Sequence, residues 1–162
     1  MQLRTLFPVL GPALRHRSRA LLALTALAAT PLHSATSEPA DSLTATVTGL
    51  RSAKGQVIAC LTGRAQGFPR CDRDLDAIAA RAGAASQVEL DFGRVPPGRY
   101  AISLFHDENG NGKLDTRLGI PREGYGFSRD APVRLGPPSF RAAAFPVERS
   151  GQHQTIRMRY IF

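Results

Sequence analysis

Apolar and polar residues alternate along several short segments of the chain, and this period of two residues is typical of half-buried β-strands. The alternation is clearest in residues 87–92 (QVELDF), 100–106 (YAISLFH) and 155–162 (TIRMRYIF). Residues 43–50 (LTATVTGL) and 56–61 (QVIACL) are rich in Thr, Val and Ile and are joined by a short turn. These two segments therefore predict a first hairpin.

Two further segments indicate how the strands connect. Residues 95–98 (VPPG) predict a tight turn, because proline fixes φ and glycine accepts a positive φ. We therefore expect residues 100–106 to pair antiparallel with residues 87–92. Residues 72–85 are ambiguous, since they fit either a short helix behind an aspartate cap or an irregular crossing that ends in an edge strand.

Short strands joined by Gly- and Pro-containing turns predict an all-β fold. The expected architecture is an antiparallel β-sandwich, prealbumin- or immunoglobulin-like, with about seven strands and one long aromatic, Gly-rich loop. A small closed barrel is the alternative. The predicted core consists of apolar residues that share the inward faces of the strands: Val47, Val57, Leu90, Phe92, Ile102, Leu104, Ile156 and Met158.

The N-terminal segment, residues 1–37, predicts a signal peptide that is removed from a single domain of residues 38–162. Four arginines precede an apolar run at 20–29 (ALLALTALAA) that is too short to span a bilayer, and a cleavage site of small residues follows. The predicted location is therefore periplasmic or secreted. Since no later segment is long and apolar, we expect no stable membrane insertion after cleavage.

The charge of the domain differs from that of the whole chain. The chain has 21 Lys and Arg against 13 Asp and Glu, a formal net charge of +8. Four of the 21 lie in residues 1–37, which leaves 17 − 13 = +4 for the domain. Because the arginines do not cluster or alternate with aromatic residues, this charge does not predict nucleic-acid binding.

The two cysteines, Cys60 and Cys71, predict a disulfide, because a small even number of cysteines in an exported domain is typical of one. Gly63, Gly67 and Pro69 let the chain turn back between them. The alternative is a pair of unpaired buried thiols. A redox-active pair is disfavoured because the C-x-x-C spacing is missing.

The segment with the most specific chemistry follows residues 100–106. Oxygen-bearing residues stand there at alternate positions: Asp107, Asn109, Asn111, Lys113 (through its carbonyl) and Asp115. With Gly112 among them they approach the D-x-[DN]-x-[DN]-G pattern of calcium loops, so calcium is the one cofactor that the sequence suggests. Leu118 occupies the twelfth position, where an EF-hand has Glu, and a strand precedes the loop. The hypothesis is a weak strand-loop site, and the alternative is a turn bonded to its own side chains.

A second long loop carries the aromatic residues Tyr125, Phe127 and Phe140. They could line a groove for a sugar, a peptide or a lipid head group. Alternatively, they could fold over one end of the sandwich as a lid on the core.

Three long motifs make the sequence familiar: FHDENGNGKLD at 105–115, GIPREGYGFS at 119–128 and GPPSFRAAAF at 136–145. With them the chain resembles a family of exported bacterial proteins that is catalogued only as a domain of unknown function, from about residue 44 to residue 162. The VPPGRY turn at 95–100 is more weakly similar to prealbumin-like sandwich modules. The resemblance implies a fold and a compartment but no activity.

Two functional hypotheses follow. The first is a non-enzymatic binding or structural module that recognises an unknown envelope ligand or protein, with calcium ordering the 107–115 loop. The second is a hydrolase of envelope material that uses His106 with Asp107 or Asp115. The first is favoured, because the sequence has no catalytic triad and no G-x-S-x-G context.

Overall fold

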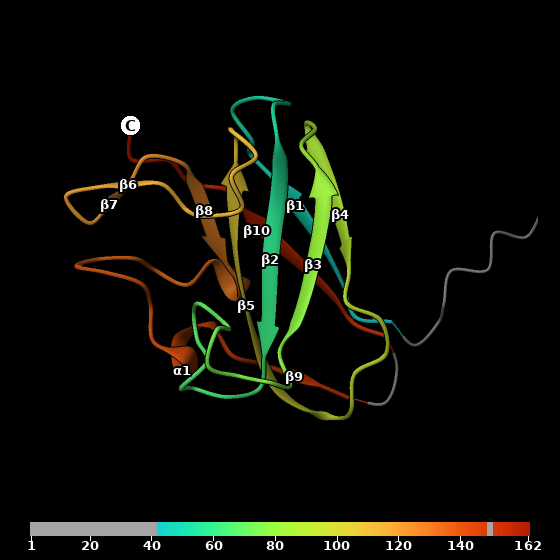
Figure 1. The fold of residues 1–162 in the computed structure, drawn as a ribbon. Coiled ribbons are helices and arrows are strands. Elements are labelled where there is room, and N and C mark those ends of the chain that lie inside the picture. Colours follow the sequence, from blue (N-terminus) through green and yellow to red (C-terminus); the bar gives the residue numbers. More distant parts are fainter. Residues whose placement is uncertain (1–41, 149–150) are drawn as a thin grey trace, which may run out of the picture. The chain divides into compact units, whose positions relative to one another are not determined.

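The computed structural model of the protein describes residues 42–148 and 151–162. Nearly all regular structure in this part is β, with one 3-10 helix, η1 (Ser128–Asp130), and one short α-helix, α1 (Phe140–Ala143) (Figure 1). The predicted signal peptide lies outside the described residues. Within them, no helix has both the length and the apolar character that crossing a membrane requires.

The first sheet has three strands in the order β10-β1-β4. The central strand β1 (Thr44–Thr48) pairs antiparallel with β4 (Gln87–Asp91) and parallel with β10 (His153–Arg157). Alternation decides which residues turn inward: Val88 and Leu90 of β4 are buried, while the residues that alternate with them are exposed, namely Gln87, Glu89 and Asp91.

The second sheet has the order β3-β2-β5-β8 and is antiparallel throughout. Its strands are β3 (Ile78–Gly83), β2 (Gln56–Thr62), β5 (Gly98–Asp107) and β8 (Gly124–Phe127), and β9 (Phe145–Val147) pairs with the start of β5. Two short strands, β6 (Thr116–Arg117) and β7 (Ile120–Pro121), form a separate hairpin. All of these antiparallel pairings fit the predicted all-β, sandwich-like fold.

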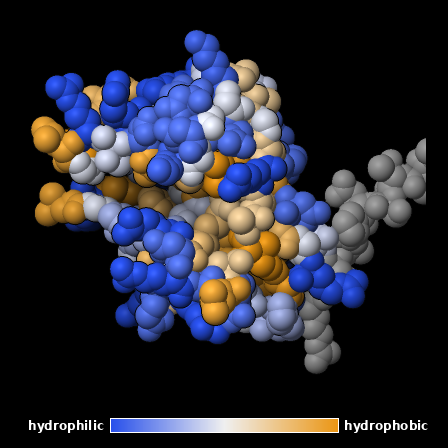
Figure 2. Space-filling model, viewed as in Figure 1, coloured by the Kyte–Doolittle hydropathy of each residue, from blue (hydrophilic) through white to orange (hydrophobic). Residues whose placement is uncertain are grey.

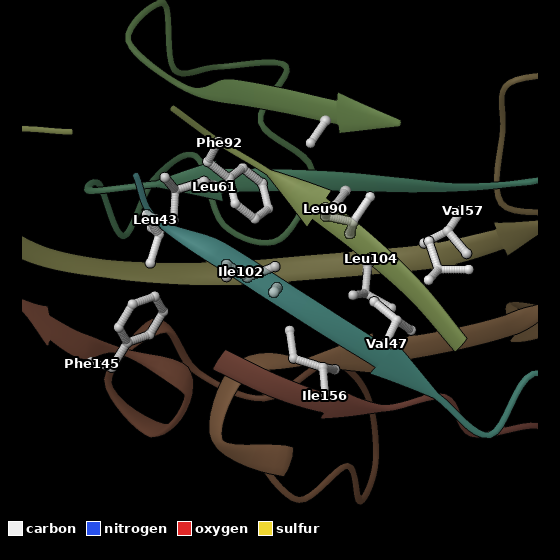
Figure 3. Packing of buried hydrophobic residues seen from close by; sticks show 14 of the residues in the cluster. Leu43, Val47, Val57, Leu61, Leu90, Phe92, Ile102, Leu104, Phe145 and Ile156 are labelled. Carbon is white, nitrogen blue, oxygen red and sulfur yellow. The ribbon is translucent and has the colours of Figure 1, made fainter. Parts of the chain in front are cut away.

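The core lies between the two sheets. Figure 3 shows Val47, Leu90 and Ile156 of the three-stranded sheet packed toward Val57, Ile102 and Leu104 of the second sheet. All eight residues of the predicted core are buried in this one cluster. Burying a side chain of this size stabilises the fold by about 1.5–3 kcal/mol.

Two predicted strand pairings are wrong. Residues 43–50 and 56–61 do not form a hairpin, because β1 and β2 lie in different sheets. Residues 100–106 do not pair with 87–92, because β4 pairs with β1 whereas β5 pairs with β2, β8 and β9. The alternation of a strand specifies which of its faces is buried. It does not specify whether another apolar strand is its hydrogen-bonded neighbour in the same sheet or packs against it from the opposite sheet.

The ambiguous segment at 72–85 contains an edge strand and no helix. Ile78, Ala80 and Ala82 alternate toward the core in β3, which pairs with β2 on one side only. The preceding loop is tied to β2 by the Cys60–Cys71 disulfide, with 6.1 Å between the two Cα atoms. The predicted disulfide is therefore present in the structure. In the chain-entropy model, a disulfide between cysteines 11 residues apart in the sequence contributes about 3 kcal/mol to stability.

The C-terminal strand is shorter than predicted. Strand β10 ends at Arg157, and Phe162 is 67% exposed instead of facing the core. Beyond β10 the chain crosses to the second sheet, where the backbone groups of Arg159 and Tyr125 exchange two hydrogen bonds of 2.9 Å. The terminal segment thus links the two sheets instead of extending one.

Candidate functional site

The candidate loop begins at Asp107, the last residue of β5, whose side chain is fully buried. Its Oδ1 accepts the backbone N–H of Asn111 at 3.0 Å, and its Oδ2 accepts the N–H of Gly112 at 2.9 Å. Oδ2 also accepts a hydrogen bond of 2.9 Å from the side-chain amide of Gln56, on β2. Strand β2 and the first turn of the loop are therefore joined through one carboxylate.

The two asparagines continue this arrangement along the loop. The Oδ1 atom of Asn109 accepts the N–H of Asn111 at 3.0 Å, and that of Asn111 accepts the N–H of Lys113 at 2.8 Å. Their amide nitrogens, Nδ2 of Asn109 and Nδ2 of Asn111, donate to the carboxylate of Asp115 at 2.8 and 3.0 Å. The structure thus brings all five predicted positions into one closed turn.

Glu123 lies outside the 107–115 loop but holds it in place, a role that the sequence did not predict. It is 5% exposed, and its two carboxylate oxygens accept the backbone N–H groups of Glu108 and Asp115 at 3.0 and 2.9 Å. One side chain therefore holds both ends of the loop together. The sequence offered only a weak signal, a glutamate directly before the GYGF segment at 124–127; once that segment is buried, the charge of the glutamate needs a partner.

The metal hypothesis for this loop stays a prediction. In residues 42–148 and 151–162, no three His, Cys, Asp or Glu side chains are gathered closely enough to hold a metal ion. Asp107 and Asp115 are bonded to backbone N–H groups and to side-chain amides, as described above. The loop is therefore a turn held by its own side chains, whose oxygens would have to exchange some of these partners to bind a cation.

His106 lies next to the loop but points into the domain. It is fully buried, its Nε2 lies 2.7 Å from the carbonyl oxygen of Lys54, and its Nδ1 lies 2.7 Å from the hydroxyl of Tyr160. A carbonyl oxygen only accepts, so Nε2 donates, and a neutral imidazole then accepts the Tyr160 hydroxyl at Nδ1. Both ring nitrogens have partners, and neither is directed at solvent.

An ion pair between Arg51 and Glu108 connects the loop to the C-terminal segment of the chain. The guanidinium of Arg51 forms a bidentate contact with Glu108 and lies over the ring of Tyr160, 4.5 Å from its centroid. Arg51 also donates to the backbone carbonyl of Phe162 at 2.6 Å. Arginine fits this position because its planar group binds a carboxylate and stacks on an aromatic ring at the same time.

The aromatic residues of the second loop lie away from this site, on the outer face of β5 and β8. Tyr125 and Phe127 are buried, and Phe140 of α1 packs beside them with Phe68. The ring centroids of Phe68 and Phe127 are 5.7 Å apart, and those of Phe68 and Phe140 are 6.1 Å apart. The three predicted binding residues thus share one packed cluster, and their proposed role in ligand binding stays a prediction.

Two carboxyl groups at the start of the loop, those of Asp107 and Glu108, have pKa values below their usual range. Burial alone would raise the pKa of Asp107, but hydrogen bonds from Gln56 and from the N–H groups of Gly112 and Asn111 outweigh it. The hydrogen bond from Arg51 lowers the pKa of Glu108. Both groups bind protons less readily in the folded state than in the unfolded chain.

This depression predicts a loss of stability in acid. Because the folded pKa is lowered, the contribution is fully present above the unfolded values of about 4 and is lost as the pH falls through the folded values. We expect the urea midpoint to be constant from about pH 7 to about pH 5 and to fall below about pH 4. In Gln56→Ala this fall should be smaller, because one of the hydrogen bonds that lower the pKa of Asp107 is removed. An identical pH profile in both proteins would show that the Gln56 side chain does not lower this pKa.

The fold and the loop define a small β-sandwich domain with a self-bonded Asp/Asn/Gly loop at the end of its longest strand. Residues 45–156 match the model of a family described as uncharacterized proteins conserved in bacteria, DUF2141. The chain therefore belongs to the DUF2141 family. Comparison with the curated proteins and with the solved structures gave no match.

Proposed function

We propose that this DUF2141 domain is an exported, non-enzymatic binding module of the periplasm or cell exterior, and that its 107–115 loop binds Ca²⁺. The observation that carries the proposal is the turn itself. The N–H groups of residues 111, 112 and 113 bond to the side-chain oxygens of residues 107, 109 and 111. These bonds hold the side-chain oxygens of three successive alternate positions close to one short stretch of backbone, and a calcium loop likewise gathers oxygens from alternate positions.

The charge of the loop supports a weak calcium site. Asp107 and Asp115 supply two formal charges at ligand positions, and Glu123 adds a buried carboxylate at the base of the loop. Leu118 stands where an EF-hand has its bidentate glutamate. With so few charged ligands, we expect a dissociation constant of roughly 10⁻⁴–10⁻³ M, in the range of extracellular modules.

The environment of His106 supports the non-enzymatic hypothesis over a hydrolase. A general base needs a free nitrogen within reach of a substrate proton. His106 instead donates to the carbonyl of Lys54 and contacts Tyr160 from a fully buried position. The adjacent Asp107 uses its oxygens to hold the turn, so no feature of this pair favours covalent chemistry.

Calorimetry and thermal unfolding with CaCl₂ test the proposal. We expect a rise in melting temperature at about 1 mM Ca²⁺ and above. The rise should be lost in Asp115→Ala. The carboxylate of Asp115 accepts hydrogen bonds from two exposed asparagine side chains, so we expect this variant to keep the fold. Asp72→Ala, which removes an exposed carboxylate elsewhere, is the matched control. Absence of both heat and thermal shift at millimolar calcium would remove the metal from the proposal.

A further inference from the structure

Large apolar residues are exposed mainly on one side of the domain. Among the described residues six are exposed, and five of them belong to three segments: Leu118 and Ile120 of the β6–β7 hairpin, Leu135 of the β8–α1 connection, and Ile161 and Phe162 at the C-terminus. These segments all extend to the same side, at the left of Figure 1. Figure 2 shows hydrophobic protrusions on that side, with a hollow between them. The sixth, Leu75, lies in the disulfide-tied loop.

Two of these residues are the tips of loops with the same local sequence. Arg117-Leu118-Gly119 and Arg134-Leu135-Gly136 are both R-L-G, and their leucines are 96% and 106% exposed. Leu118 has φ of +51°, a left-handed conformation that favours glycine. A leucine that is almost fully exposed on left-handed backbone gains little stability from burial in its own domain.

The part of the chain that carries the two tips is basic, and an arginine directly precedes each leucine. Residues 113–141 present six exposed cationic side chains, which are Lys113, Arg117, Arg122, Arg129, Arg134 and Arg141. The same range has three acidic residues: Glu123, which is buried, and Asp115 and Asp130, which are not. Asp130 is partly used within the domain, since it accepts the backbone N–H of Arg157 at 3.0 Å. An apolar tip flanked by cations is complementary to an anionic lipid surface.

We propose that the domain docks reversibly on a bilayer containing anionic phospholipid. Leu118 and Leu135 enter the region between head groups and acyl chains, and the neighbouring arginines contact lipid phosphates. A bilayer fits better than a protein partner, because two separate, fully projecting leucines would need two matching pockets at a fixed spacing. Docking by side chains at two tips differs from insertion of a spanning segment, and it does not depend on calcium.

The chain contains no tryptophan, so a single introduced tryptophan reports its own surroundings. The test uses the protein as recovered after expression, with its N-terminus read by mass spectrometry, in three versions: Leu118→Trp, Leu135→Trp and Leu75→Trp. Vesicles are made of phosphatidylglycerol and phosphatidylethanolamine, or of phosphatidylcholine alone. We expect a blue shift of emission at positions 118 and 135 with the anionic vesicles only, and no shift at position 75.

Sedimentation with the same vesicles measures the energetic contribution of the tips. We expect Leu118→Ser and Leu135→Ser each to weaken binding by about tenfold, and Leu75→Ser to leave it unchanged. Arg117→Gln and Arg134→Gln should each weaken it by about fivefold. Raising NaCl from about 0.1 to about 0.5 M should also weaken it, since screening reduces attraction to the lipid phosphates.

Three results would overturn the proposal. The first is unchanged emission at positions 118 and 135 with anionic vesicles. The second is an equal effect of Leu75→Ser and the tip variants on sedimentation. The third is a dimer in ultracentrifugation that the tip variants abolish, without vesicle binding, because the surface would then be an interface between copies of the chain.

Discussion

Gly126→Val is expected to lower the free energy of unfolding by about 3 kcal/mol. Strand β8 has the sequence GYGF, in which Tyr125 and Phe127 occupy the outer face and Gly126 faces the core. A Cβ atom at position 126 would lie 2.9 Å from Cγ2 of Ile156 and 2.9 Å from Cδ1 of Leu104. Both neighbours are buried in a close-packed core, so a larger side chain forces them from their positions.

Urea denaturation measures this effect, and Gly83→Val in the edge strand β3 is the matched control. A Cβ at Gly83 would meet no atom within 4 Å, so the control should stay within about 0.5 kcal/mol of the natural protein. Gly126→Ala should be less harmful in a Leu104→Ala background, because the clashing Cδ1 is then absent. A Gly126→Val protein as stable as the Gly83→Val control would contradict the close packing of β8.

Glu123→Ala is expected to reduce the free energy of unfolding by about 3 kcal/mol. Its buried carboxylate accepts the N–H groups of Glu108 and Asp115, and alanine leaves both donors without this partner. Hydrogen bonds to a charged acceptor are stronger than neutral ones, and an unsatisfied buried donor carries a further desolvation cost. The loop should therefore loosen at both ends.

Amide hydrogen exchange locates the effect of Glu123→Ala. We expect faster exchange at Glu108 and Asp115, with little change at Ile102 and Leu104 in the middle of β5. Glu123→Gln keeps one acceptor oxygen of similar shape and should cost about half as much. If both amides exchange at the natural rate in Glu123→Ala, Glu123 does not hold the loop closed.

Part of the fold follows from local pattern. The alternation in residues 87–92 and 100–106 correctly identified Leu90, Phe92, Ile102 and Leu104 as core residues. It did so because a strand has only two faces, and a one-residue shift would expose the whole apolar set. The cysteine pair was predictable for a similar reason, since a short loop with Gly and Pro brings its two ends together.

Strand pairing could not be obtained in this way. The inward faces of β1 and β2 are equally apolar whether the strands are neighbours or face each other across the core, and they lie in different sheets. The chain passes between the sheets through residues 49–55, a connection too long to require a hairpin. The parallel pairing of β1 with β10 joins the two ends of the domain, which no short window contains.

The loop site shows the same division. Its pattern from Asp107 to Asp115 was readable because Asx side chains bond to nearby backbone N–H groups, and these contacts span only a few residues. The contributions of Glu123, Gln56 and Arg51 were not readable. Arg51 lies 57 residues before Glu108 in the sequence and Glu123 lies 15 residues after it, so only folding brings these side chains to the loop.

The sequence by itself determined that this DUF2141 chain forms half-buried strands, which residues fill their core, and that an Asp/Asn/Gly turn follows the longest strand. Tertiary structure alone decided which strands are neighbours, how the turn is anchored, and that Leu118 and Leu135 project on one side. The physical reason is range. Periodicity and turn chemistry act over a few residues, whereas pairing and packing depend on which distant segments satisfy each other's buried surfaces and polar groups.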